Sequence, residues 1–189
     1  ILMLDIGTDL LPALALGGDP ARADALDRPP ITGHLIDNGL LRRVFAVLGP
    51  TEAVVEMLAF LTAMVAAGWR PGQGFPDGHP LLAASGAAFA AVVLGQVANA
   101  FACRSSRQPP WRLGWFTNRG LIAAIGVELL ILIGALTIPP LADLLDQAWP
   151  PFPALLVALA AIPAVLAVDA LYKRSRGRAG MPGTREVGG

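Results

Sequence analysis

Uncharged apolar stretches of membrane-spanning length dominate this chain. No Asp, Glu, Lys or Arg occurs from Leu81 to Cys103, and the last stretch stays uncharged until Asp169. A helix needs about 20 mostly apolar residues to cross a bilayer. The sequence therefore predicts an all-α membrane protein, a bundle of five transmembrane helices. The predicted helices lie near residues 1–18, 45–69, 81–103, 120–139 and 152–172.

Composition agrees with a membrane setting. The chain of 189 residues is 54% hydrophobic and only 15% charged, whereas soluble domains carry about a quarter charged residues. The formal net charge of +0 gives no indication of a nucleic-acid partner. The single Cys103 excludes an internal disulfide and a cysteine metal cage.

The basic residues lie almost entirely in the connections on one side of the predicted bundle. Of the 14 Lys and Arg residues, only Arg70 falls on the opposite side. The positive-inside rule makes the basic side cytoplasmic, with the N-terminus outside and the C-terminus in the cytoplasm. Residues 1–174 are then the membrane domain, and the Gly-rich residues 175–189 are expected to be a disordered basic cytoplasmic tail.

Two carboxylates interrupt the first apolar stretch. Asp5, Thr8 and Asp9 follow i, i+3, i+4 spacing, so they share one helix face, and Pro12 leaves the Thr8 carbonyl without its helical donor. Charged groups within a membrane usually serve a function. These oxygens predict an intramembrane site for a hard cation, not for copper or zinc. Because two nearby carboxylates repel each other, proton uptake on ion release is expected.

Sequence motifs then indicate a family. Residues 5–12, Asp-Ile-Gly-Thr-Asp-Leu-Leu-Pro, and 25–30, Ala-Leu-Asp-Arg-Pro-Pro, resemble the sixth transmembrane helix and following loop of type II P-type cation-transporting ATPases. The loop departs from the family pattern at Leu26 and Ile31. Resemblances to the seventh through tenth helices extend the match to about residue 174. They lie at residues 48–53, 95–105, 118–130 and 169–174.

This resemblance implies six ligands for the transported ion. They are Asp5, Thr8 and Asp9 of the sixth helix, Gln96 and Asn99 of the eighth, and Glu128 of the ninth. Asp5 stands where sodium pumps have Asp and muscle-type calcium pumps have Asn, which favours a monovalent or proton-coupled ion. The cation stays unidentified among Na⁺, K⁺, Ca²⁺ and a proton-coupled ion.

Structural roles compete with these assignments. Gln96 and Asn99 could simply hydrogen-bond a neighbouring helix, and Glu128 could pair with a polar group there. Asp169 is expected to be an interfacial partner of the basic tail. Glu52 follows Pro50 and is interpreted as an interfacial residue in a first helical turn. Glu56, one turn further, is left open.

The enzymatic motifs of the family are missing from this sequence. It contains neither Asp-Lys-Thr-Gly-Thr nor Thr-Gly-Glu nor a Gly-rich nucleotide loop. The chain is therefore expected not to hydrolyse ATP alone and to have no catalytic residue. ATP and Mg²⁺ would act only through the actuator, phosphorylation and nucleotide domains of an N-terminal remainder, which also supplies helices one to five. Because the sequence begins with Ile1 instead of Met, the chain is expected to be the downstream piece of a longer protein.

The leading interpretation is the C-terminal transmembrane part of an ATP-driven cation pump, multi-pass in a bacterial plasma membrane and in contact with membrane lipid. Two alternatives remain open. One is a stand-alone membrane interaction or regulatory module, and the other is a small secondary transporter that uses Asp5 and Asp9 for proton coupling. The reading frame upstream of Ile1 would distinguish them.

Overall fold

The computed structural model describes residues 10–19, 36, 38–105 and 108–179, and every regular element among them is helical. This confirms the all-α prediction. Residues 10–16 are helical. The remaining elements are α2 (Asn38–Arg43), η1 (Val44–Leu48), α3 (Gly49–Ala66), α4 (His79–Cys103), α5 (Pro110–Leu113), α6 (Arg119–Thr137), α7 (Pro139–Leu144), α8 (Phe152–Leu159) and α9 (Ala161–Ala179).

Four helical segments of the described chain are long and apolar enough to cross a membrane. They are Asn38–Ala66, His79–Cys103, Arg119–Thr137 and Phe152–Arg176. All four agree with predicted spans, although the first begins several residues before the predicted position 45. The fifth predicted span, near residues 1–18, lies half outside the described residues. The last helix continues to Ala179, so the first residues of the predicted disordered tail are helical.

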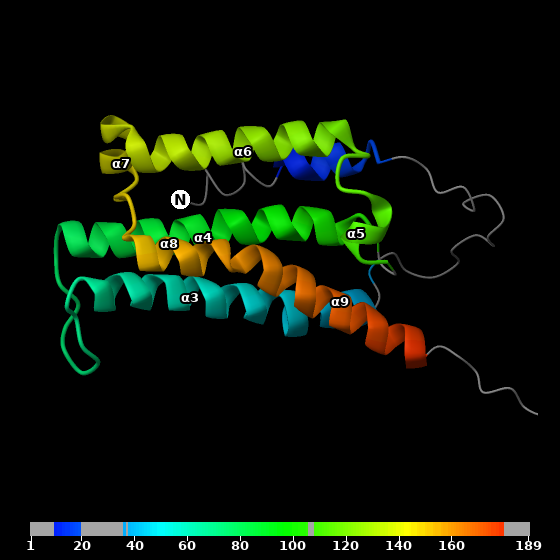
Figure 1. Cartoon of the computed structure of the whole chain (residues 1–189), viewed down its shortest axis with the longest axis horizontal. Helices are drawn as coiled ribbons and strands as arrows, with labels where there is room; N and C mark the ends of the chain where they lie inside the picture. The colour runs from blue at the N-terminus through cyan, green and yellow to red at the C-terminus, as the bar shows by residue number, and fades with distance from the viewer. Residues whose placement is uncertain (1–9, 20–35, 37, 106–107, 180–189) are drawn as a thin grey trace, which may run out of the picture.

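Helix α4 is the centre of the bundle (Figure 1). It packs against α3, α8 and α9 on one side and against α6 on another. Its buried residues are mostly small, including Ala84, Gly86, Ala87 and Ala98. Small side chains let helix backbones approach closely, which is the main source of helix association in lipid. Leu130 on α6 is 70% exposed and lies on the surface available to lipid.

Two prolines lie within long helices, and each distorts the backbone locally. Pro50 has no N–H, and the preceding turn widens into the π-helix η1, where the Gly49 N–H bonds the Val44 carbonyl. Pro50 does lie in the first turn of α3, as predicted. However, α3 continues directly from η1 and α2, so this turn is inside a long helix. Pro163 similarly accompanies the break at Ala160 between α8 and α9.

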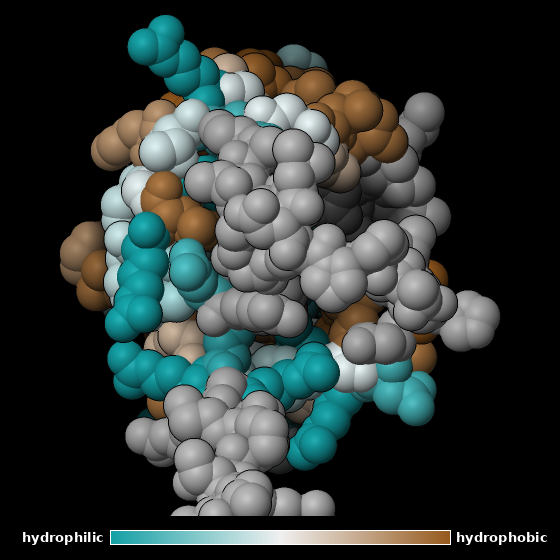
Figure 2. Space-filling view, turned by 90° about the vertical axis from the view of Figure 1, so that its right-hand side faces the viewer, coloured by the Kyte–Doolittle hydropathy of each residue, from teal (hydrophilic) through white to brown (hydrophobic). Residues whose placement is uncertain are grey.

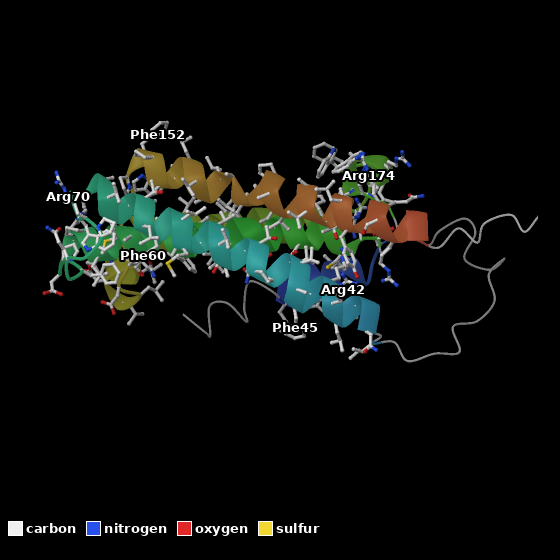
Figure 3. All side chains as sticks on the ribbon, turned by 90° about the horizontal axis from the view of Figure 1, so that it is seen from below. Arg42, Phe45, Phe60, Arg70, Phe152 and Arg174 are labelled. Carbon is white, nitrogen blue, oxygen red and sulfur yellow. The ribbon has the colours of Figure 1, made fainter. Side chains whose placement is uncertain are left out.

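The basic residues of the described chain lie at the two ends of the bundle. Figure 3 shows Arg42 and Arg174 at one end and Arg70 at the other. We call the first the basic end, because Arg42 and Arg174 lie there. Helix α4 ends at the basic end, and α2 and α6 begin there. Hydrophilic side chains gather on it in Figure 2. The cytoplasmic assignment of this end stays a prediction.

Gly86 allows the chain after α7 to lie against α4. A Cβ atom at Gly86 would overlap the Ala148 carbonyl oxygen and lie 3.2 Å from the Leu136 Cδ2 atom. The Ala148 N–H meanwhile donates to the Leu82 carbonyl oxygen at 3.1 Å. A backbone carbonyl held by this contact cannot move away as a flexible side chain could.

We therefore expect Gly86→Ala to lower the free energy of unfolding by about 1–3 kcal/mol, because overpacking forces the backbone to shift. Gly126→Ala is the matched control, since nothing lies within 4 Å of a Cβ placed there, and alanine favours helix. Dodecyl-sulfate unfolding of the purified protein measures both. Equal stability of the two variants would contradict the close approach at Gly86.

Candidate intramembrane cation site

The structure describes only part of the predicted ligand set. Asp5, Thr8 and Asp9 lie outside the described residues, as does the Asp-Arg-Pro-Pro loop at residues 27–30. Gln96, Asn99 and Glu128 are described. Helices α3, α4 and α6 form the described surroundings of these three residues.

Asn99 lies in the next-to-last turn of α4 and is oriented by a carboxylate from the neighbouring helix. Its Nδ2 donates a hydrogen bond to Glu52 Oε1 on α3. The other end of the amide, Oδ1, is buried and has no hydrogen-bond partner among the described residues. Gln96 is three residues earlier and shares this face of α4. Among the described residues, the amide oxygen, which is the kind of atom that hard cations prefer, is thus left without a donor.

Glu52 is the polar residue that the sequence analysis misplaced. Its expected interfacial position is wrong, because the helix extends back to Asn38 and Glu52 is half-buried within a spanning segment. Its side chain lies beside Gly95 as well as Asn99. An acidic residue inside a long apolar run was the signal that could have identified it. The continuous helix through Pro50 obscured that signal.

Glu128 lies in the middle of α6 and has no exposed surface. Its neighbours in sequence, Val127 and Leu130, are 43% and 70% exposed, so the carboxyl belongs to the inner face of the helix. A carboxylate at such a depth must be protonated, paired or bound to a cation. The burial is what an ion or proton site requires, and it equally fits pairing with a neighbouring helix.

The segment that follows Asp9 is anchored between the two helices that carry these residues. Ala15 and Leu16 pack against Val97 of α4 and Leu121 of α6. Asn118 caps α6, since its Oδ1 accepts from the Leu121 N–H, and its Nδ2 donates to the Ala15 carbonyl at 2.9 Å. The start of α6 is therefore fixed to the end of the first apolar stretch.

A second contact holds the same segment at the basic end. Arg104, just after α4, pairs with Asp19 at 2.9 Å and donates to the Gly114 carbonyl at 2.7 Å. Both ends of residues 15–19 are thus tied to neighbours of α4. In the described part of the chain, no three His, Cys, Asp or Glu side chains lie close enough together to hold a metal. A complete oxygen cage would need residues 5–9.

A buried ionic cluster lies at the basic end, and we call Arg43, Asp169 and Lys173 the basic-end cluster. Asp169 has no exposed surface and pairs with Arg43 Nη2 at 2.6 Å and Lys173 Nζ at 2.5 Å. Both cations also donate to the carbonyl of Ala102, at 3.0 and 2.9 Å. Asp169 pairs with a basic residue of the tail region as expected, and its side chain is fully buried in the bundle. The cluster joins α2, α4 and α9.

Comparison with known proteins identifies related sequences. The family described as "Cation transporting ATPase, C-terminus" matches residues 1–175. A Bacillus cereus protein named calcium-transporting ATPase 1 is 28% identical over 152 residues, covering 76% of this chain and 17% of its own length. The Bacillus subtilis calcium-transporting ATPase is 27% identical over 93% of this chain and 19% of its own length. The Drosophila melanogaster sodium/potassium-transporting ATPase subunit alpha is 30% identical over 40% of the chain and 8% of its own. The chain thus spans less than a fifth of these relatives.

Proposed function

The chain belongs to the P-type cation-transporting ATPases and corresponds to their C-terminal membrane domain, and from this premise we propose that it contributes part of the ion-binding site and transport path of an ATP-driven cation pump. The observation that carries the proposal is the match of the family over residues 1–175, which includes nearly every described helix.

The proposed site combines residues of the first helix with residues of α4 and α6. Asp5, Thr8 and Asp9 would supply carboxylate and hydroxyl oxygens from the first helix. Asn99 would add its Oδ1, because Glu52 occupies the amide nitrogen. Gln96 and Glu128 would complete the polar lining from α4 and α6. Oxygen ligands of this kind select hard cations.

The source of energy would lie outside this chain. The relatives are about five or more times longer than the matched region, since the chain covers 17% and 19% of the two Bacillus proteins. We propose that the N-terminal remainder of the same polypeptide supplies ATP and Mg²⁺ binding and the phosphorylated aspartate. The membrane is proposed to be a bacterial plasma membrane, with the basic end in the cytoplasm. Residues 1–174 would form the membrane domain.

The chemistry of the proposed ligands identifies the class of the ion, a hard cation. Relatives are named for calcium and for sodium with potassium, and both groups of ions are hard cations. A pair of carboxylates that is emptied within the membrane would repel, so we propose that a proton replaces the departing ion.

Cation-stimulated ATP hydrolysis by the complete protein in proteoliposomes tests the proposal. We expect one of Ca²⁺, Na⁺ or K⁺ to stimulate hydrolysis at least several-fold and to be transported. Zn²⁺ and Cu⁺ should not substitute, since the predicted ligands contain no sulfur or imidazole. Stimulation by Zn²⁺ or Cu⁺ alone, or hydrolysis that no cation affects, would contradict the proposal.

A further inference from the structure

A hollow of about 510 Å³ lies between α2 and α9 at the basic end. The Tyr172 hydroxyl donates to the Gly39 carbonyl at 2.9 Å and so links the two helices beside it. The Arg176 guanidinium lies over Gly39, where a Cβ atom would be 2.8 Å from its Cζ. The hollow is lined by Asn38, Gly39, Arg42, Tyr172, Ser175 and Arg176.

Two cations in this hollow, Arg42 and Arg176, have no carboxylate partner in the part of the chain that the structure describes. Arg43 and Lys173 pair with Asp169, and Arg104 pairs with Asp19. None of the ion pairs found among the described residues includes Arg42 or Arg176. Two guanidinium groups beside the Asn38 amide present the donors that bind phosphate oxygens. The Ser175 hydroxyl already donates to the Tyr172 carbonyl at 2.8 Å.

The surroundings indicate where the phosphate comes from. Phe45 lies three residues after Arg42 and is 74% exposed, and Leu171 lies four residues before Ser175 and is 63% exposed. These spacings place each apolar side chain on the same helix face as its polar partner, one turn toward the middle of the bundle. Both helices belong to helical segments of membrane-spanning length, Asn38–Ala66 and Phe152–Arg176. A ligand with a phosphate group and an attached acyl chain would match both the basic hollow and the apolar side chains next to it.

We propose that this hollow binds the phosphate group of an anionic phospholipid, whose acyl chains lie along Phe45 and Leu171. The bound lipid bridges α2 and α9, which belong to the first and last of the four described spans. Basic pockets between membrane helices are suited to such headgroups. The proposal is independent of the ion site.

Photolabelling of the complete protein in phosphatidylcholine nanodiscs tests this site. A photoactivatable phosphatidylglycerol is titrated in, and labelled peptides that contain residues 38–45 or 171–176 are quantified by mass spectrometry. We expect Arg42→Gln and Arg176→Gln each to raise the half-saturating lipid fraction about fivefold, since each substitution removes a direct charge-assisted contact to the phosphate. Arg174→Gln is the matched control, because Arg174 is exposed on the same helix and does not line the hollow.

Each outcome decides the proposal. A fivefold shift for Arg42→Gln and Arg176→Gln with no shift for Arg174→Gln supports it. Equal shifts for all three variants would mean diffuse attraction by surface charge and would overturn it. Suppression of labelling by millimolar inorganic phosphate, at constant ionic strength, would indicate a site for a free anion and would also overturn it. Thermal inactivation of each variant in pure phosphatidylcholine shows whether the fold is kept, and Gly39→Leu, which displaces Arg176, supplies a second route to the same loss.

Discussion

Replacing Asp169 by alanine is expected to lower the free energy of unfolding by about 3–5 kcal/mol, because it leaves two buried cations without their shared carboxylate. Arg43 and Lys173 are 8% and 6% exposed, so water cannot readily replace the lost partner. The Ala102 carbonyl, at the C-terminal end of α4, would keep its contacts to both cations. The negative end of the α4 dipole offsets only part of their charge. Titration of the purified protein with dodecyl sulfate measures the loss.

A neutral version of the basic-end cluster provides the control. Arg43→Met, Asp169→Leu and Lys173→Met together remove every charge while keeping similar volumes. Apolar replacement of a whole buried ionic cluster is often neutral or stabilising, so the triple variant should be markedly more stable than Asp169→Ala alone. If Asp169→Ala unfolded like the unmodified protein, the cluster would not hold α2, α4 and α9 together.

The sequence predicted the helices well because their signals are local. Uncharged runs such as Leu81–Cys103 gave α4 to within two residues of its observed start at His79. The helix that contains Pro50 was predicted less well. A proline normally ends or begins a helix. Here a π-helical turn, η1, accommodates Pro50 inside a long helix and packs against α9, and no local sequence signal predicts such a turn.

Contacts between helices were mostly beyond the sequence. Spacing placed Gln96 and Asn99 on one face of α4, but it could not show that Glu52 on α3 lies opposite them. The close approach of Ala148 to Gly86 likewise joins positions far apart in the chain. Such contacts depend on how each helix is rotated and how far it is shifted along its neighbour, which apolar periodicity does not determine in lipid.

The arrangement of α4 suits this helix to carry the proposed ligands Gln96 and Asn99. Its Ala102 carbonyl binds the basic-end cluster, and Asn99 lies three residues earlier in the same helix. One end of α4 is therefore fixed to α2 and α9 close to the amide that would face the ion. Rigid placement of a ligand oxygen favours selectivity, because the oxygen cannot adjust freely to an ion of another size.

The loss of ion binding on replacing both opening aspartates is the other large effect that we expect. Asp5→Ala and Asp9→Ala together remove both carboxylates that the first helix contributes to the proposed cage. Replacing a residue that only orients a metal ligand usually weakens metal binding about 10- to 100-fold. Loss of two direct ligands should therefore weaken binding by more than about 100-fold. Asp143→Ala is the matched control, because Asp143 is an exposed carboxylate on α7.

Equilibrium binding of the stimulating radioactive cation to the complete protein, without ATP, is the most direct measurement. Saturable binding that survives Asp143→Ala and disappears in the Asp5→Ala, Asp9→Ala double variant is the predicted result. Unchanged affinity in a double variant that stays folded, as judged by its unaltered unfolding curve, would contradict an ion site built from these residues.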